Sequence, residues 1–169
     1  RDVCDTPSNF RSQGKLDDML KKLGVIGICG IDTRELTKIV RESGVMNAII
    51  TDKPTLDPAK KKQLDEYVIK DAVKSVSCTQ KRVVCTVKKP KKRVALLDYG
   101  IKKNIIEKLA KRGCEVTVFP HNTSADEIIN FAPDGIMLSN GPGNPEENTY
   151  EITQIKKLVK SGIPMFGIC

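Results

Sequence analysis

Residues 93–100 read Arg-Val-Ala-Leu-Leu-Asp-Tyr-Gly, an apolar run that ends abruptly in an acid and a glycine. A short, unbroken apolar run of this kind is typical of a strand buried on both faces of a sheet. Outward from it, three more such runs follow at residues 115–119, 135–138 and 163–168. Together with residues 94–97 they predict four strands.

Helical stretches separate these runs. Residues 103–111, 124–131 and 148–160 each carry apolar side chains at helical spacing, and Ser124 with Glu127 forms a capping box. Strands that alternate with helices need crossover connections, which build a parallel sheet with helices on both faces. The sequence therefore predicts an α/β fold, with ligand chemistry at the carboxyl ends of the strands.

Two of the loops at those carboxyl ends have distinctive composition. Asp98 follows the first strand, where an acid usually caps the next helix, although a ligand-binding role stays open. Ser139–Pro145 holds Gly141 and Gly143, so this rigid loop can direct backbone N–H groups at a developing negative charge. The same composition also suits an ordinary tight turn, and the Gly-Lys-Ser/Thr ending of a phosphate-binding loop is missing.

The third loop is Gly167-Ile168-Cys169, directly after the fourth strand. A nucleophile elbow places Ser or Cys on a strained turn between small neighbours, and Gly167 provides one such neighbour. The same tripeptide recurs at Gly27-Ile28-Cys29, and a buried, unreactive thiol is the default interpretation for either copy. Position favours Cys169, because it ends a strand of the alternating sheet on the same edge as the Gly141 loop.

The first half of the chain is less regular, and its helices and strands predict a smaller α/β domain over residues 1–80. Apolar spacing and caps predict helices at residues 16–23, from Thr33 until Gly44, and from Asp57 to about Val68. Apolar runs predict strands at residues 25–29 and 45–51, with weaker candidates at 72–76 and 82–87.

The net charge of +8 has one local source. Residues 81–93 contain seven Lys or Arg side chains and no acid. Lysines keep exposed strand edges from aggregating, so we expect a basic linker or strand edge before the sheet domain of residues 94–169. A non-catalytic module that binds an anionic partner is the alternative, although the run has no aromatic side chain on which bases could stack.

Composition excludes several classes of protein. With 39% hydrophobic and 30% charged residues, the chain can form a core, and its apolar runs are too short to cross a membrane. Six cysteines without a secretion signal predict reduced, cytosolic thiols. The lone histidine, His121, predicts no zinc site and is expected in a solvated loop. Because residue 1 is Arg, we expect an internal fragment.

Motifs in both halves carry a family resemblance. Gly141-Pro142-Gly143-Asn144-Pro145, followed at this spacing by Ile163–Cys169, resembles the opening of a class I, Cys-type glutamine amidotransferase domain. Within that class, Ile31–Thr37 (Ile-Asp-Thr-Arg-Glu-Leu-Thr) and residues 98–105 (Asp-Tyr-Gly-Ile-Lys-Lys-Asn-Ile) resemble the small, glutaminase subunit of carbamoyl-phosphate synthetase. The resemblance covers essentially the whole chain. It implies that residues 1–80 are the later part of the small subunit's N-terminal domain and that residues 94–169 are the first part of its amidotransferase domain, which ends here at the nucleophile.

The resemblance implies that Cys169 is the nucleophile, that the Gly141 N–H helps to hold the oxyanion, and that Gly143 lines the substrate pocket. It implies L-glutamine as substrate, no cofactor or metal in this subunit, and no nucleic-acid or membrane partner. The implied partner in a heterodimer is a large synthetase subunit, which uses ATP and Mg to make carbamoyl phosphate for arginine and pyrimidine synthesis.

The same resemblance predicts whether the chain alone is active, and it also identifies the nearest alternative family. The family's Leu-Gly-His-Gln elbow and its catalytic His and Glu do not occur in residues 1–169, so the chain alone is expected to be inactive. Other Cys-type amidotransferases, such as those serving GMP or anthranilate synthesis, are the nearest alternative, and they would lack the Ile31–Thr37 motif.

Overall fold

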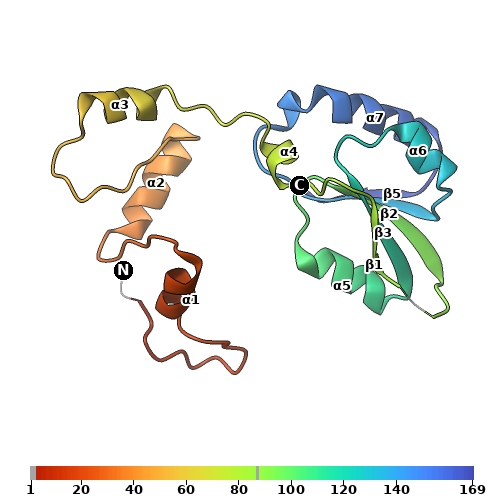
Figure 1. Cartoon of the computed structure of the whole chain (residues 1–169), viewed down its shortest axis with the longest axis horizontal. Helices are drawn as coiled ribbons and strands as arrows, with labels where there is room; N and C mark the ends of the chain where they lie inside the picture. Colours follow the sequence, from red (N-terminus) through yellow and green to blue (C-terminus); the bar gives the residue numbers. More distant parts are fainter. Residues whose placement is uncertain (1–2, 87) are drawn as a thin grey trace. The chain divides into compact units, whose positions relative to one another are not determined.

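The computed structural model of the protein describes residues 3–86 and 88–169 (Figure 1). It divides into two compact units, one up to Val68 and one from Ile69 onward. Residues 69–80, predicted as the end of the first domain, therefore belong to the unit that holds the sheet. One hydrogen bond that attaches this segment to the sheet runs from the backbone N–H of Cys78 to Asp98 Oδ2, at 2.9 Å.

Among residues 3–68, the first unit contains three helices, α1 (Leu16–Leu23), α2 (Thr33–Ser43) and α3 (Pro58–Asp65). Their predicted caps are present. Gly24 ends α1 with a φ of 63°, and Asp32 Oδ1 accepts hydrogen bonds from the backbone N–H groups of Arg34 and Glu35 at 3.0 and 3.1 Å. Asp57 Oδ1 caps α3 by accepting from the Ala59 N–H. Local sequence signals therefore placed these helices correctly.

The two strands predicted in the first unit, at residues 25–29 and 45–51, are wrong. Both segments lie outside any helix or strand, with Ile26 77% exposed and Val45 95% exposed. A strand is stable only when a neighbour satisfies its backbone groups, and no strand lies within the described residues 3–68. An apolar run alone does not supply that neighbour.

The second unit is built around a sheet with the strand order β1-β3-β2-β4-β5. Its strands are β1 (Arg82–Cys85), β2 (Lys92–Asp98), β3 (Cys114–Pro120), β4 (Gly135–Leu138) and β5 (Met165–Gly167). Its helices are α4 (Ala72–Val76), α5 (Lys103–Lys111), α6 (Ala125–Asn130), the 3-10 helix η1 (Pro145–Glu147) and α7 (Thr149–Lys160). Strands β2 to β5 are parallel, as predicted, and β1 is antiparallel to β3.

The two weaker strand predictions, at residues 82–87 and 72–76, have different outcomes. Residues 82–85 do form a strand, at the edge of the sheet within the predicted basic linker, while Val87 lies outside the described residues. Residues 72–76 form helix α4 instead, so that prediction is wrong. Its two valines favour a strand by propensity, but Val73 is buried in the helix and Ser75 N–H donates to the Asp71 carbonyl.

Helices cover both faces of the sheet (Figure 1). On one face, Ala95 and Leu97 of β2 pack with Ile128 of α6 and Leu158 of α7. On the other face, strand residues such as Leu96 pack with apolar side chains of α5. Alternate residues of one strand thus enter opposite cores, as expected for a sheet buried on both sides. In the described residues, no helix is long and apolar enough to cross a membrane.

The strand register brings three loops to one edge of the sheet. Leu97 of β2 pairs with Leu138 of β4, which in turn pairs with Gly167 of β5. The segments that follow these residues, beginning at Asp98, Ser139 and Ile168, therefore leave the sheet at the same level. This is the edge where the sequence predicts ligand chemistry.

Candidate active site

Cys169 follows β5 in a strained backbone conformation. Its φ is 81°, in the left-handed region that residues other than glycine seldom adopt, and its side chain is exposed. The preceding residue is fixed, because the Ile168 N–H donates to the Leu138 carbonyl at 3.1 Å. Positive φ at an exposed thiol directly after a strand is the geometry expected of a nucleophile elbow.

The second copy of the tripeptide has no such setting. Cys29 is exposed in the first unit, outside any helix or strand, and its φ is not among the positive values found at non-glycine residues. The sequence analysis preferred Cys169 over Cys29 because of its position after a strand of the sheet. The backbone conformation also distinguishes the two, since only Cys169 has a positive φ. All six cysteines lie within the described residues, and none of them is in a disulfide there.

The loop of Gly141 and Gly143 has room only for glycine. A Cβ added at Gly141 would lie 2.6 Å from the Tyr99 carbonyl oxygen, and one at Gly143 would lie 3.0 Å from the Ala72 Cβ. Gly143 also has a φ of 78°. The loop base is fixed by Ser139, whose Oγ accepts from the Tyr99 N–H at 2.9 Å. Absent side chains leave the backbone of this loop accessible to a ligand.

One cavity of about 310 Å³ brings together the three residues proposed from the sequence, Gly141, Gly143 and Cys169. Much of its wall is apolar, from Leu138 at the end of β4 and Ile155 of α7. Ligand pockets commonly combine an apolar wall with a few convergent polar groups. Here the lining residues that carry polar groups include Cys169 and Glu151.

Asp98 has a structural role, but it does not cap the next helix as the sequence favoured, because the N-cap of α5 is Lys102 and no side chain caps it. Its Oδ1 accepts from the backbone N–H groups of Gly100 and Ile101 at 3.0 and 3.1 Å, and its Oδ2 accepts from the Cys78 N–H. The carboxylate therefore holds the turn after β2. Burial, followed by the negative charge of Asp98, raises the pKa of the Cys78 thiol, which favours its unreactive protonated form.

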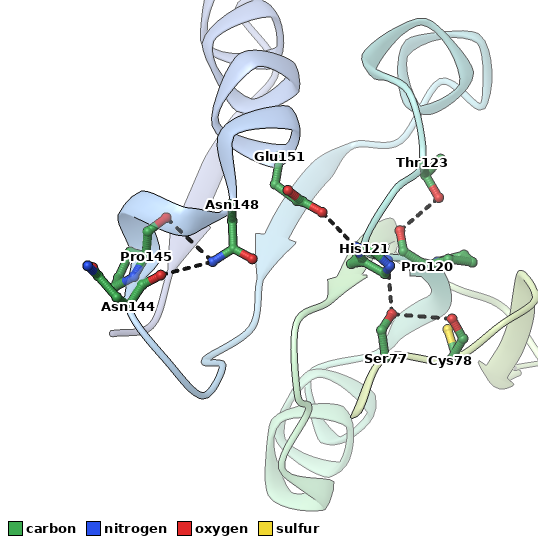
Figure 2. A network of polar contacts seen from close by, with 9 residues as sticks. All are labelled: Ser77, Cys78, Pro120, His121, Thr123, Asn144, Pro145, Asn148 and Glu151. Atoms are coloured by element: carbon green, nitrogen blue, oxygen red, sulfur yellow. Dashed lines mark hydrogen bonds and ion pairs between the residues drawn. The ribbon is translucent and has the colours of Figure 1, made fainter. Parts of the chain in front are cut away.

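The sequence missed a polar pair at the same edge, shown in Figure 2. His121 Nδ1 and Glu151 Oε1 lie 2.6 Å apart, and the two side chains are only 16% and 11% exposed. The expectation of a solvated His121 is therefore wrong. The loop backbone is also held, because the His121 N–H donates to Ser77 Oγ at 2.9 Å. His121 directly follows β3, so the strand-end rule could have flagged it, whereas no spacing rule pairs it with Glu151.

Tyr99 lies beside this pair. Its hydroxyl is buried and has no hydrogen-bonding partner within the described residues, and its side chain contributes to the cavity wall. Burial, with a smaller effect from the charge of Glu151, raises the pKa of Tyr99. The phenol therefore stays neutral over the physiological range.

Comparisons with known proteins cover both halves of the chain. Residues 95–169 match the family model described as glutamine amidotransferase class-I, and residues 1–50 match that of the carbamoyl-phosphate synthase small chain, CPSase domain. The carbamoyl phosphate synthase small chains of Clostridium perfringens and Clostridium acetobutylicum are 44% and 41% identical to this chain over 170 residues. The pyrimidine-specific small chain of Halalkalibacterium halodurans is 41% identical over 170 residues.

These similarities extend over the whole chain but over only part of each relative. The alignments cover 100% of this chain, and 47%, 47% and 46% of the three relatives in the order given above. The chain thus spans about half the length of the curated relatives it matches. The glycine loop and Cys169 both fall inside the amidotransferase match, and Ile31–Thr37 falls inside the small-chain match. Residues 95–169 are therefore similar to class I glutamine amidotransferases, and the chain as a whole is similar to carbamoyl-phosphate synthase small chains.

Proposed function

We propose that this chain carries the nucleophile of a glutamine-hydrolysing carbamoyl-phosphate synthase small subunit. One observation carries the proposal: the strained, exposed Cys169 and the glycine loop line a single cavity at the carboxyl edge of the sheet. L-glutamine has an amide carbonyl that suits a thiol nucleophile, and the cavity of about 310 Å³ is large enough for an amino acid.

The proposed chemistry is a double displacement at the amide carbon of glutamine. The Cys169 thiolate attacks that carbon, the C–N bond breaks, and the departing nitrogen takes up a proton and leaves as ammonia. Water then cleaves the glutamyl thioester, which releases glutamate and restores the thiol. The Gly141 N–H would hold the oxyanion of each tetrahedral intermediate, where one such donor is worth about 3 kcal/mol. Gly143 would line the space beside it.

His121 is not assigned as the base in this scheme. It is not among the residues that line the cavity, and its Nδ1 is already bonded to Glu151. A base must reach the proton that it removes.

The proposed partner is a large synthetase subunit that receives the ammonia and binds ATP and Mg. Carbamoyl phosphate made by that pair would serve arginine and pyrimidine synthesis. The relatives' description as small chains supports a partnered subunit, and six free cysteines support a reducing compartment such as the cytoplasm. No cofactor is proposed for this chain itself.

Binding of an anionic partner through residues 81–93 is the weaker alternative, because several of these cations already have intramolecular partners. Lys81 and Arg93 stack over the Phe131 ring at 4.7 and 4.4 Å, and Lys92 Nζ lies 2.9 Å from Asp134 Oδ1. These contacts favour a structural role for the basic run. If the run instead bound phosphates, affinity for nucleic acid would fall steeply with salt.

A glutamine analogue with a chloromethyl ketone in place of the amide tests the proposal on the full chain. The thiolate would displace chloride from the terminal carbon, and peptide mapping would identify the alkylated cysteine. We expect Cys169 to react much faster than Cys29, which is also exposed and follows the same two residues. Equal rates at the two thiols would contradict the proposed function.

A further inference from the structure

We propose that Ser139 is a positioning residue for the oxyanion donor, because its hydroxyl fixes the peptide plane that carries the Gly141 N–H. This inference rests on the proposed function and deepens it, since it names the side chain that prepares the donor before a substrate binds. Ser139 directly follows β4, lines the same cavity as Cys169 and is only 5% exposed.

Both hydrogen bonds of the Ser139 hydroxyl have a direction that its partners determine. The Tyr99 N–H can only donate, and it lies 2.9 Å from Ser139 Oγ, so the oxygen accepts there. The single hydroxyl proton is then left for the Asn140 carbonyl oxygen, which is also 2.9 Å away. Among the described residues, this is the one hydrogen bond that the Asn140 carbonyl accepts. The hydroxyl therefore joins the turn after β2 to the peptide unit after β4.

The orientation of that carbonyl determines the direction of the Gly141 N–H. The two groups belong to one planar trans peptide unit, in which the carbonyl and the N–H point in opposite directions. Because the hydroxyl holds the Asn140 carbonyl, it also holds this N–H. No described residue accepts a hydrogen bond from the Gly141 N–H, and Gly141 lines the cavity. Oxyanion stabilisation depends on donors that are free and already oriented before the reaction.

Neighbouring contacts hold the chain around this peptide unit but do not reach its carbonyl. Asn140 Nδ2 donates to the Gly100 carbonyl at 3.2 Å, and the Ser139 N–H donates to the Leu97 carbonyl at 3.3 Å. A hydrogen bond to a peptide carbonyl also polarises the unit and strengthens its N–H as a donor. Ser139 thus acts on both the direction and the strength of the Gly141 donor.

The test measures alkylation of Cys169 in the full chain by two reagents. The first is the glutamine analogue with a chloromethyl ketone, whose ketone oxygen takes the place of the amide oxygen. The sulfur bonds to the terminal carbon as chloride leaves, and a hydrogen bond to the ketone oxygen activates that carbon. The second reagent, iodoacetamide, alkylates exposed thiols without a binding step. Rates at several concentrations of the ketone probe give its maximal rate and its half-saturating concentration separately.

We expect Ser139→Ala to lower the maximal rate of the ketone probe at Cys169 about tenfold. This loss is smaller than the about hundredfold loss typical when an oxyanion donor is removed outright, because the Gly141 N–H is still present. The half-saturating concentration and the iodoacetamide rate should change little, whereas a general loss of structure would change both. Ser139→Thr keeps the hydroxyl and should restore most of the maximal rate. An unchanged maximal rate in Ser139→Ala would overturn the proposal.

Ser161→Ala is the matched control. The Ser161 hydroxyl is also bonded to two backbone groups, since it donates to the Leu158 carbonyl at 2.6 Å and accepts from the Ile163 N–H at 3.3 Å. Ser161 does not line the cavity, so its substitution should leave the maximal rate of the ketone probe unchanged. Equal losses of maximal rate in the two alanine variants would show a general effect of losing a bonded hydroxyl and would also overturn the proposal.

Failure of this inference is distinguishable from failure of the proposed function. If the ketone probe modifies Cys169 much faster than Cys29 but Ser139→Ala keeps the maximal rate of the parent chain, the role of Ser139 is wrong and the proposed function stands. If the probe modifies the two thiols of the parent chain equally fast, the proposed function itself is wrong.

Discussion

Gly141 is the residue at which the backbone of the site has least freedom. A Cβ there would lie 2.6 Å from the Tyr99 carbonyl oxygen and 3.1 Å from the Tyr99 Cβ, and neither a backbone oxygen nor a Cβ can easily move away. We therefore expect Gly141→Ala to displace the loop and to lower the free energy of unfolding by about 1–3 kcal/mol, the usual cost of overpacking. Denaturant titration measures this change, and the chloromethyl ketone probe should lose its selectivity for Cys169.

Gly135→Ala is the matched control for that substitution. Its Cβ would make an ordinary contact of 3.5 Å with the Pro164 carbonyl, in strand β4 and away from the cavity lining. Stability and labelling of Cys169 should both change little. Equal effects of the two substitutions would show that the loop geometry at Gly141 has no special importance.

At the level of single elements, Asp134, the residue directly before β4, forms hydrogen bonds to the first two residues of β2. Its carboxylate accepts from the Arg93 N–H at 2.7 Å and from Lys92 Nζ at 2.9 Å, and these hydrogen bonds lower its pKa below the ordinary value of 3.8. A lowered pKa means that the charged form stabilises the fold. This stabilisation is complete above the unfolded-state pKa and is lost as the pH falls through the folded-state pKa.

We therefore expect Asp134→Asn to reduce the loss of stability on acidification. The free energy of unfolding, measured by denaturant titration from pH 5 down to about pH 2, should fall less steeply in the variant than in the parent chain. The effect should be small because the carboxylate is exposed. A pH profile that is unchanged by the substitution would contradict the assignment of these bonds.

Elements also differ in how far their sequence determines them. The caps at Gly24 and Asp32 are local, so helices α1 and α2 could be predicted from a few neighbouring residues. Strands β2 to β5 were predictable because their alternation with helices restricts the topology. Residues 25–29 and 45–51 have similar apolar runs, but whether such a run becomes a strand depends on distant partners. The pair of His121 and Glu151 escaped prediction for the same reason, since 30 residues separate them.

The candidate site, too, could be predicted only in part from local sequence, because its geometry depends on residues far apart in the chain. Cys169, Gly141 and Gly143 could be selected because each follows a predicted strand and carries a distinctive residue type. Their shared cavity depends on the strand register from Leu97 to Leu138 to Gly167, which only the folded sheet fixes. Glu151 lies within a helix, where a carboxylate is ordinary, so its place in the cavity wall gave no sequence signal.

At the scale of the whole chain, the two units differ in how much side-chain surface each one buries. No residue from 3 to 68 is buried, whereas the sheet of the second unit has a buried core on each face. Backbone amides exchange slowly when their hydrogen bonds lie in such a core. The two units should therefore differ sharply in their resistance to local opening.

Hydrogen exchange should reveal this difference directly. We expect the slowest-exchanging amides in β2, β3 and β4, and rapid exchange throughout residues 3–68, including the helices α1 to α3. Brief proteolysis should accordingly cleave the first unit and leave a resistant fragment that contains residues 92–169. If the amides of α1 to α3 exchanged as slowly as those of the sheet, the expected difference in local opening between the two units would be wrong.

The central claim is that Cys169 and the Gly141 loop form a glutamine-binding site. Protection of cysteines from iodoacetamide by L-glutamine tests it most directly, because the uncharged reagent reaches exposed thiols without help from the site. The account predicts that L-glutamine slows the alkylation of Cys169 in proportion to its occupancy and leaves the rate at Cys29 unchanged. Alkylation of Cys169 at the same rate with and without saturating L-glutamine would contradict it.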